Sequence, residues 1–248
     1  MRGLDESVRV HTNGFGTRQR ARARRLFWLG ADLLRHKLTL EAEAGGETHS
    51  ASSVVENGVR GVIQFSLSPT IGIGQQGEAL YLDLGPKCRP LIALLGRRAV
   101  NTEQKPATYN YRAGNFERIA ALYGAAAPQW RKGKFYEWID GWDAFAGLRG
   151  AKDITPANLP DLVTFADIND PKTVMEVDAA NPGAALNCDF KWKRITIEVT
   201  DEPVTTGIEK KLAWLEGLHG SIGKDLGLDA GHLLNRIHEG VFWQGIQK

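Results

Sequence analysis

The stretch Leu159–Asp178 reads LPDLVTFADINDPKTVMEVD, and the stretch Phe190–Leu218 reads FKWKRITIEVTDEPVTTGIEKKLAWLEGL. The first predicts a short buried strand at Leu162–Phe165, an acidic turn and a second strand that ends at Val177. The second predicts a strong strand at Lys191–Thr200, because its β-branched and aromatic residues favour extended backbone. Another acidic turn and a helix are expected after that strand. The order of these elements indicates an α+β protein.

The N-terminal half of the chain predicts β-hairpins. His36–Ala44 alternates polar and apolar residues, Gly45–Gly46 supplies a turn, and Thr48–Val55 returns as a second strand. The dipeptide Asn57–Gly58 predicts a further tight turn, which leads into a strand at Val62–Leu67. Because neighbouring strands pair locally, these segments are expected to form one antiparallel sheet.

A glycine-rich stretch at Gly72–Gly77 matches the pattern GxGxxG. A dinucleotide-binding loop of this pattern needs a strand before it and a helix that opens at its last glycine. Glu78–Leu84 instead alternates like a strand, so we interpret Gly72–Gly77 as a hairpin loop. Leu91–Leu95 predicts a further short strand on the same sheet.

The middle of the chain changes to a helical pattern. Asn115–Tyr123 and Lys134–Leu148 both place apolar residues at helical spacing, and Trp138 and Trp142 belong to the second of them. A last helix is predicted at Ala230–Phe242. Together these elements predict an α+β fold, in which an antiparallel β-sheet built from hairpins has amphipathic helices packed on one face.

The length and composition of the chain are those of a globular protein. The chain has 248 residues, of which 42% are apolar and 24% are charged, and a chain of this length can bury a core. The net charge of +2 gives no general basis for binding nucleic acid. We expect an N-terminal arm at residues 1–34 and a single α+β domain at residues 35–248, with a sub-boundary near residues 100–114.

The arm combines a basic and an apolar segment. Five arginines lie in Arg18–Arg25, and the apolar run Leu26–Leu34 that follows is interrupted by Asp32. A spanning helix needs about twenty apolar residues, so this run is too short to cross a membrane. A solvated extension, an altered signal region and a segment lying on anionic lipid stay open as alternatives. The residues expected to meet an anionic membrane or partner are Arg20, Arg22, Arg24, Arg25, Phe27 and Trp28.

The two acidic turns supply candidate metal ligands. Ca²⁺ and Mg²⁺ prefer several carboxylate oxygens, and Asp167, Asp170, Asp201 and Glu202 would provide them. The alternative is that each carboxylate caps a turn or a helix and faces water. No cofactor is predicted, and a divalent cation is the alternative. The chain contains no GxSxG, HExxH or Walker motif, which favours a non-catalytic protein.

Three smaller sequence features concern two threonines, the two cysteines and two of the histidines. Thr205 and Thr206, with Glu209 after them, resemble the capping box of a helix N-terminus. Cys88 and Cys188 are not in a zinc-binding spacing, and a disulfide and two buried free thiols explain them equally well. His36 and His49 are expected to face each other across the first hairpin as a solvent-exposed pair.

Several stretches carry a resemblance to a known family. The chain resembles an uncharacterised family of bacterial hypothetical proteins, to which no activity is assigned. The matching stretches are LTLEAEAGGETHSASSVVE (38–56), ALYLDLG (79–85) with LIALL (91–95), LVTFADINDPKTVMEVD (162–178) and WKRITIEVTDEPVTTGIEKKLAWL (192–215). Members of that family tend to begin with a basic segment and a hydrophobic stretch. The resemblance therefore implies membrane anchoring or export, and it implies no catalytic residues.

We accordingly expect a non-catalytic binding or accessory protein, associated with the bacterial envelope or membrane, that binds an unidentified protein partner. A cytoplasmic location is the alternative. The alternative function is that of a metal-dependent enzyme or divalent-cation binder that uses the two acidic turns. An anionic membrane surface is the partner expected for the arm, and nucleic acid is not an expected partner.

Overall fold

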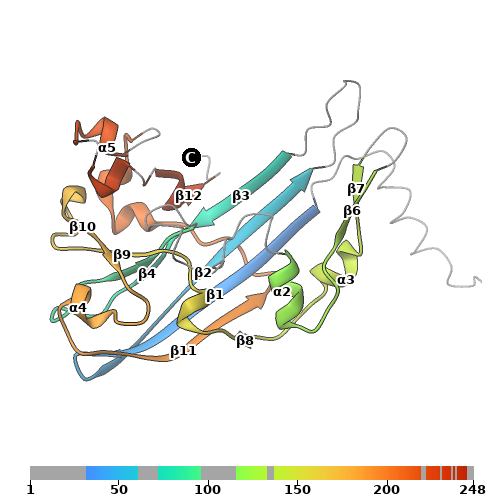
Figure 1. Cartoon of the computed structure of the whole chain (residues 1–248), viewed down its shortest axis with the longest axis horizontal. Helices are drawn as coiled ribbons and strands as arrows, with labels where there is room; N and C mark the ends of the chain where they lie inside the picture. Colours follow the sequence, from blue (N-terminus) through green and yellow to red (C-terminus); the bar gives the residue numbers. More distant parts are fainter. Residues whose placement is uncertain are drawn as a thin grey trace, which may run out of the picture.

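Two antiparallel sheets, with short helices around them, make up most of the fold (Figure 1). The computed structural model describes residues 32–60, 72–95, 116–132, 137–218, 222–229, 231–235, 237 and 239–244. Within these ranges the architecture is mixed and mostly β, which confirms the predicted α+β fold.

The larger sheet has six strands in the order β12-β3-β2-β1-β11-β8. They are β1 (Asp32–Ala44), β2 (Glu47–Arg60), β3 (Gly72–Glu78), β8 (Lys152–Asp153), β11 (Phe190–Val199) and β12 (Trp243–Gln244). The predicted first hairpin is confirmed: β1 and β2 pair around Gly45–Gly46, whose φ angles of 56° and 88° suit a two-residue hairpin turn. β1 already begins at Asp32, inside the segment expected to belong to the arm.

The prediction of a tight turn at Asn57–Gly58 was wrong. β2 runs through this dipeptide to Arg60, because β1 pairs with it on one side and β3 on the other. The hairpin loop expected at Gly72–Gly77 was wrong for the same reason, since these residues lie in β3, in register with β2. Pairing on both sides outweighs the local turn preference of Asn and Gly. The strand expected at Val62–Leu67 lies outside the described residues.

The chain passes from the larger sheet to the smaller one at Ala79, directly after β3. Gly77 has a φ of 141°, and a Cβ on it would lie 3.1 Å from the Cα of Val55, so only glycine fits this close approach. The smaller sheet has the order β10-β9-β5-β4, made of β4 (Leu80–Leu82), β5 (Leu91–Ala93), β9 (Leu162–Phe165) and β10 (Val174–Val177). The strand expected at Leu91–Leu95 therefore exists, but it belongs to the smaller sheet and not to that of the first hairpin.

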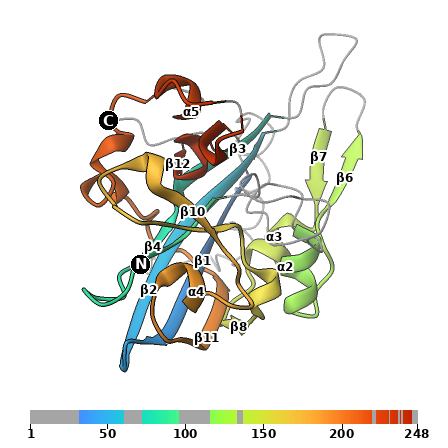
Figure 2. The same cartoon turned by 60° about the vertical axis from the view of Figure 1, so that its left-hand side comes forward.

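The smaller sheet is buried on both faces. Leu91 and Ala93 of β5 point into a first core against the larger sheet, while Ile92 points into a second core against the C-terminal segments. Burial on both faces explains why this strand reads as an unbroken apolar run. Figure 2 shows the C-terminal helix α5 (Ile222–Asp225, red) at the opposite end of the molecule from β8.

Short helices cover the other end of the first core. α2 (Phe116–Leu122) confirms the first predicted helix and buries Ile119 and Ala120 there. The helix predicted over Lys134–Leu148 was wrong, because β6 (Gln129–Lys132) and β7 (Glu137–Asp140) form a hairpin instead. Gly141, with a φ of 79°, separates β7 from the short helix α3 (Trp142–Ala146). The remaining α-helices are α4 (Gly183–Leu186) and α5 (Ile222–Asp225).

After β11, the described residues form short 3₁₀ turns and the four-residue helix α5 instead of the two longer α-helices that the sequence predicted. The helix expected at Ala230–Phe242 is wrong, since η5 and η6 occupy this region. Ile208, Leu212 and Leu215 are nevertheless buried in the second core, so their helical spacing marked a buried face correctly. Two 3₁₀ turns precede β11, namely η1 (Pro156–Asn158) and η2 (Pro171–Thr173). Those described after it are η3 (Ile208–Lys210), η4 (Ala213–Leu215), η5 (Leu233–Asn235) and η6 (Glu239–Val241).

Candidate functional site

The first acidic turn, between β9 and η2, is held by its own side chains. The Asp167 carboxylate accepts a hydrogen bond from the amide of Asn169 at 2.9 Å, and the Asp170 carboxylate accepts one from the amide of Lys172 at 3.0 Å. Pro171 then starts η2. Each aspartate therefore bonds the backbone two residues later, as Asp does in turns throughout proteins.

The second acidic turn, after β11, is held by ion pairs. Asp201 lies 2.7 Å from the guanidinium of Arg149, and Glu202 pairs with Lys37 of β1. The hydrogen bond from Lys37 to Glu202 is the main cause that raises the pKa of this lysine. All of these groups lie on the surface, where such pairs contribute little stability.

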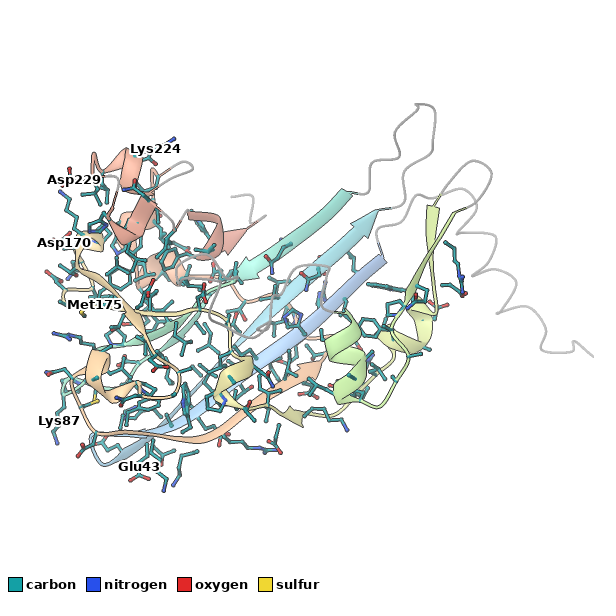
Figure 3. All side chains as sticks on the ribbon, viewed as in Figure 1. Glu43, Lys87, Asp170, Met175, Lys224 and Asp229 are labelled. Carbon is teal, nitrogen blue, oxygen red and sulfur yellow. A yellow bond between two sulfur atoms is a disulfide. The ribbon has the colours of Figure 1, made fainter. Side chains whose placement is uncertain are left out.

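The structure does not bring the two acidic turns together. Asp167 and Asp170 follow β9 of the smaller sheet, whereas Asp201 and Glu202 follow β11 of the larger sheet. Figure 3 places Asp170 at one extreme of the molecule, while β11 ends beside α2 in Figure 1. Within the described ranges, no three His, Cys, Asp or Glu side chains come together as a metal site would require. Cation binding by either turn alone stays a prediction.

The arginine-rich arm, with Arg20, Arg22, Arg24, Arg25, Phe27 and Trp28, lies outside the described residues. Among the helices that are described, none has the length and apolar character needed to cross a membrane. Contact of the arm with an anionic surface therefore remains an expectation from sequence.

A row of polar side chains, two of them buried and one half-buried, crosses the core-facing side of the larger sheet. Asn57 of β2 is paired directly with Gln75 of β3, and His36 of β1 is a diagonal neighbour of Asn57 on the same face. His36 and Asn57 are 0% and 3% exposed. We call His36, Asn57 and Gln75 the polar row.

The polar row consists of neutral hydrogen-bonding groups. The side-chain nitrogen of Asn57 lies 3.3 Å from Nδ1 of His36, and since an amide nitrogen only donates, Nδ1 is the acceptor. Burial lowers the pKa of His36 to about 3, so the imidazole is neutral at physiological pH. Among the described residues, Oδ1 of Asn57 and both polar side-chain atoms of Gln75 are buried without a hydrogen-bond partner. Such groups are rare in folded proteins, and we therefore take the polar row as the candidate site for a polar ligand.

The register of the first hairpin corrects the expectation for the histidines. His36 is opposite Val55, and His49 is opposite Ala42, so the two rings do not face each other. His36 is also fully buried and not solvent-exposed. The expected pairing failed because the turn at Gly45–Gly46 fixes which residues are opposite, and this register separates the two histidines along the ladder.

A buried glutamate replaces the expected capping box. The Glu78 carboxylate accepts hydrogen bonds from the amides of Gly207 and Ile208, both at 2.8 Å, at the start of η3. Thr205 does not cap this turn; its hydroxyl oxygen accepts a hydrogen bond from the amide of Val54 at 2.9 Å. Burial is the main cause that raises the pKa of Glu78, against the lowering effect of the two amides.

The structure also decides between the alternatives for the two cysteines. Cys88 and Cys188 form a disulfide with a Cα–Cα distance of 5.4 Å and a sequence separation of 100 residues. The bond joins the loop before β5 to the segment after α4. Beside it, Arg89 donates hydrogen bonds from its amide to Leu186 O and from its side chain to Ala185 O, both at 2.9 Å.

Sequence reasoning missed the polar row and Glu78. One signal was present: His36 stands between Leu34 and Leu38 in a two-residue alternation, which places it on the buried face. Asn57 was instead assigned to a turn, and Glu78 to an ordinary strand. Their partners lie on other strands or more than a hundred residues away, so local patterns could not indicate them.

Comparison with known proteins adds no further assignment. No protein-family model matches the chain, and no curated protein or solved structure shows significant similarity to it.

Proposed function

We propose that this chain is a non-catalytic binding or accessory protein, associated with the bacterial envelope, that works in an oxidising compartment. The disulfide between Cys88 and Cys188 is the observation that carries the proposal. Disulfides persist in exported proteins and in the periplasm, whereas cytosolic thiols are kept reduced.

The position of the disulfide supports a structural role in such a compartment. Cys88 precedes β5 of the smaller sheet, and Cys188 precedes β11 of the larger sheet. The bond therefore links the two sheets across the end of the first core. A hydrogen bond from the amide of Gly45 to Asp189 O, at 3.3 Å, adds the β1–β2 turn to the same end of the molecule.

The polar row supports binding more than catalysis. An efficient general base has a pKa near the working pH, and a histidine with a pKa of about 3 is too weakly basic for this role. Asn57 and Gln75 do not titrate, but their amides offer both donors and acceptors. These groups are suited to recognising a neutral polar group without proton transfer.

The redox state of the protein in cells tests the proposal. The full chain would be expressed in a bacterial host, its free thiols would be trapped by alkylation at the moment of lysis, and the cells would be fractionated. We expect Cys88 and Cys188 to resist alkylation and the protein to be in the envelope fractions. A Cys88→Ser variant, which leaves Cys188 alkylatable, is the matched control. Complete alkylation of the wild-type protein in the cytosol would overturn the proposal.

A divalent-cation binder is the second candidate. It is favoured by the first acidic turn, where Asp167 and Asp170 lie three residues apart and each has one carboxylate oxygen bonded to an amide. Thermal unfolding with and without Ca²⁺, Mg²⁺, Mn²⁺ or Zn²⁺ tests it, since a ligand that binds only the native state raises the melting temperature. A shift lost in Asp167→Asn but kept in Asp178→Asn would support this function. Asp178 is a matched control, because its carboxylate accepts from the amide of Ala180 in the same way. No shift with any ion would exclude it.

A further inference from the structure

The side-chain amides of Asn57 and Gln75 in the polar row do not bond each other. The two residues are directly opposite in the β2–β3 ladder, and side chains in such a pair are close enough to interact. Among the residues that the structure describes, Oδ1 of Asn57 and both polar atoms of Gln75 are nevertheless buried without a hydrogen-bond partner. The pair therefore leaves a set of hydrogen-bonding positions unfilled inside the fold.

His36 determines which atom of Asn57 belongs to this unfilled set. Nδ1 of His36 accepts from the side-chain nitrogen of Asn57 at 3.3 Å, so the nitrogen of this amide is engaged and its oxygen is left. Gln75 contributes both atoms of its amide. The unfilled set thus consists of two acceptors, Oδ1 of Asn57 and Oε1 of Gln75, and of the donor nitrogen Nε2 of Gln75.

The charged residues that flank the polar row along β1 and β2 lie on the other face of the sheet. Arg35 and Glu56 alternate with the row, and they form an ion pair with each other at 2.7 Å. His36 is neutral because burial lowers its pKa to about 3. An ionised ligand would lose its hydration at the row without meeting an opposite charge on these residues. The row therefore favours a neutral ligand group.

We propose that the polar row binds a primary carboxamide, the group CONH₂. Gln75 presents a donor and an acceptor on adjacent atoms of one plane, and a carboxamide presents the same two groups in reverse. The carboxamide oxygen accepts from Nε2 of Gln75, one of its N–H groups donates to Oε1 of Gln75, and the second N–H donates to Oδ1 of Asn57. A carboxylate has no donor and an ammonium group has no acceptor, so neither fills the set.

The exposure of the polar row indicates the side from which the carboxamide enters. His36 and Asn57 are 0% and 3% exposed, whereas Gln75 is half-buried. The described part of β12 pairs with β3 at Gly77 and Glu78 and does not extend to Gln75. The carboxamide therefore meets Gln75 first, and the rest of the ligand stays on the β3 side of the row.

Thermal unfolding of the full, oxidised chain with amide probes tests the proposal. Acetamide and the methylamide of N-acetylglutamine both carry the primary carboxamide, whereas N,N-dimethylacetamide lacks the two N–H donors and glycerol offers hydroxyl groups. We expect the first two probes to raise the melting temperature of the wild type and the last two to leave it unchanged. A larger shift with the glutamine derivative assigns the carboxamide to a peptide side chain, and equal shifts assign it to a small free amide.

The variant Gln75→Met gives a second measurement that needs no ligand. Methionine is unbranched like glutamine but lacks both amide atoms. Because unfilled buried polar groups destabilise the native state, we expect this variant to raise the melting temperature of the free protein by about 2 to 8 °C and to lose the response to acetamide. Gln76→Met, at an exposed position of the same strand, is the matched control and should keep that response. Gln75→Leu provides the same test if Gln75→Met does not fold.

Three results would overturn the proposal. The first is a wild-type protein that does not respond to acetamide, and the second is an equal response to N,N-dimethylacetamide or glycerol. The third is a lower melting temperature of free Gln75→Met, which would show that the amide of Gln75 has a partner in the free protein. The inference rests on the proposed function, since it names the ligand class of a binding protein. Its failure would nevertheless leave the results of thiol alkylation and cell fractionation unchanged, so the two proposals fail separately.

Discussion

The carboxylate of Glu78, in β3, accepts a hydrogen bond at 2.8 Å from the amide of Ile208, which lies 130 residues later in the chain. The amide of Gly207 donates to the same side chain. Glu78 therefore attaches the first C-terminal 3₁₀ turn to the point where the chain passes from the larger sheet to the smaller one.

Glu78→Ala should lower the free energy of unfolding by about 2 to 4 kcal/mol, because one buried and one partly buried amide lose a charged acceptor. Glu78→Gln keeps one acceptor oxygen and should cost less. Urea unfolding followed by tryptophan fluorescence measures both, since Trp214 lies close to this region and packs on Phe165 and Phe242. Gln76→Ala, at an exposed position of the same strand, is the control. Equal stability of wild type and Glu78→Ala would contradict the attachment.

His36 should make the protein sensitive to acid. Burial lowers its pKa from 6.5 to about 3, so the native state binds this proton only at much lower pH than the unfolded chain does. The stability that His36 contributes is therefore complete above about pH 6.5 and is lost as pH falls toward about 3.

Replacing this histidine tests the sign of the effect. His36→Gln carries no ionisable group, so its free energy of unfolding should fall less between pH 7 and about 4.5 than that of the wild type, with a difference on the order of 2 kcal/mol. His49→Gln, on a half-buried position of the same hairpin, serves as the control. Parallel pH profiles for the wild type and His36→Gln would refute the prediction.

The disulfide should stabilise the native state by restricting the unfolded chain. Because Cys88 and Cys188 are 100 residues apart, replacing both with serine should lower the free energy of unfolding by about 2 to 5 kcal/mol. The same loss should follow when a reducing agent is added to the wild-type protein. Denaturation curves with and without the reducing agent measure the effect. The double serine variant should not respond to it, and a response there would show that the reagent acts elsewhere.

Replacing Thr205 should destabilise the protein much more than replacing its neighbour Thr206. Thr205→Val removes the acceptor for the amide of Val54 and should cost about 1 to 2 kcal/mol. Thr206 is exposed, so Thr206→Val should change stability by less than about 0.5 kcal/mol. Thermal unfolding of the two variants side by side is sufficient. A larger loss of stability in Thr206→Val than in Thr205→Val would instead indicate that Thr206 caps the turn.

How far the sequence predicts this fold can be seen from particular elements. The buried strand β9, the acidic turn at Asp167–Asp170 and the long strand β11 were predicted with nearly correct bounds. The hairpin of β1 and β2 was predicted with the correct turn, but both of its strands were predicted too short. In each case the signal is local: alternation of side chains, a glycine turn, or aspartates that bond the next amides. The predicted helices failed more often, because helical spacing of apolar residues marks a buried face without fixing the backbone that carries it.

The sequence by itself determined the α+β class, the first hairpin and the buried face of its first strand, since these follow from the period of apolar side chains and from turn residues. Tertiary structure decided the division into two sheets, the strand character of Gly72–Gly77, the disulfide and the polar row. It also assigned the capping role to Glu78 instead of Thr205. These features depend on partners far apart in the chain, and only the folded backbone brings those partners within hydrogen-bonding distance.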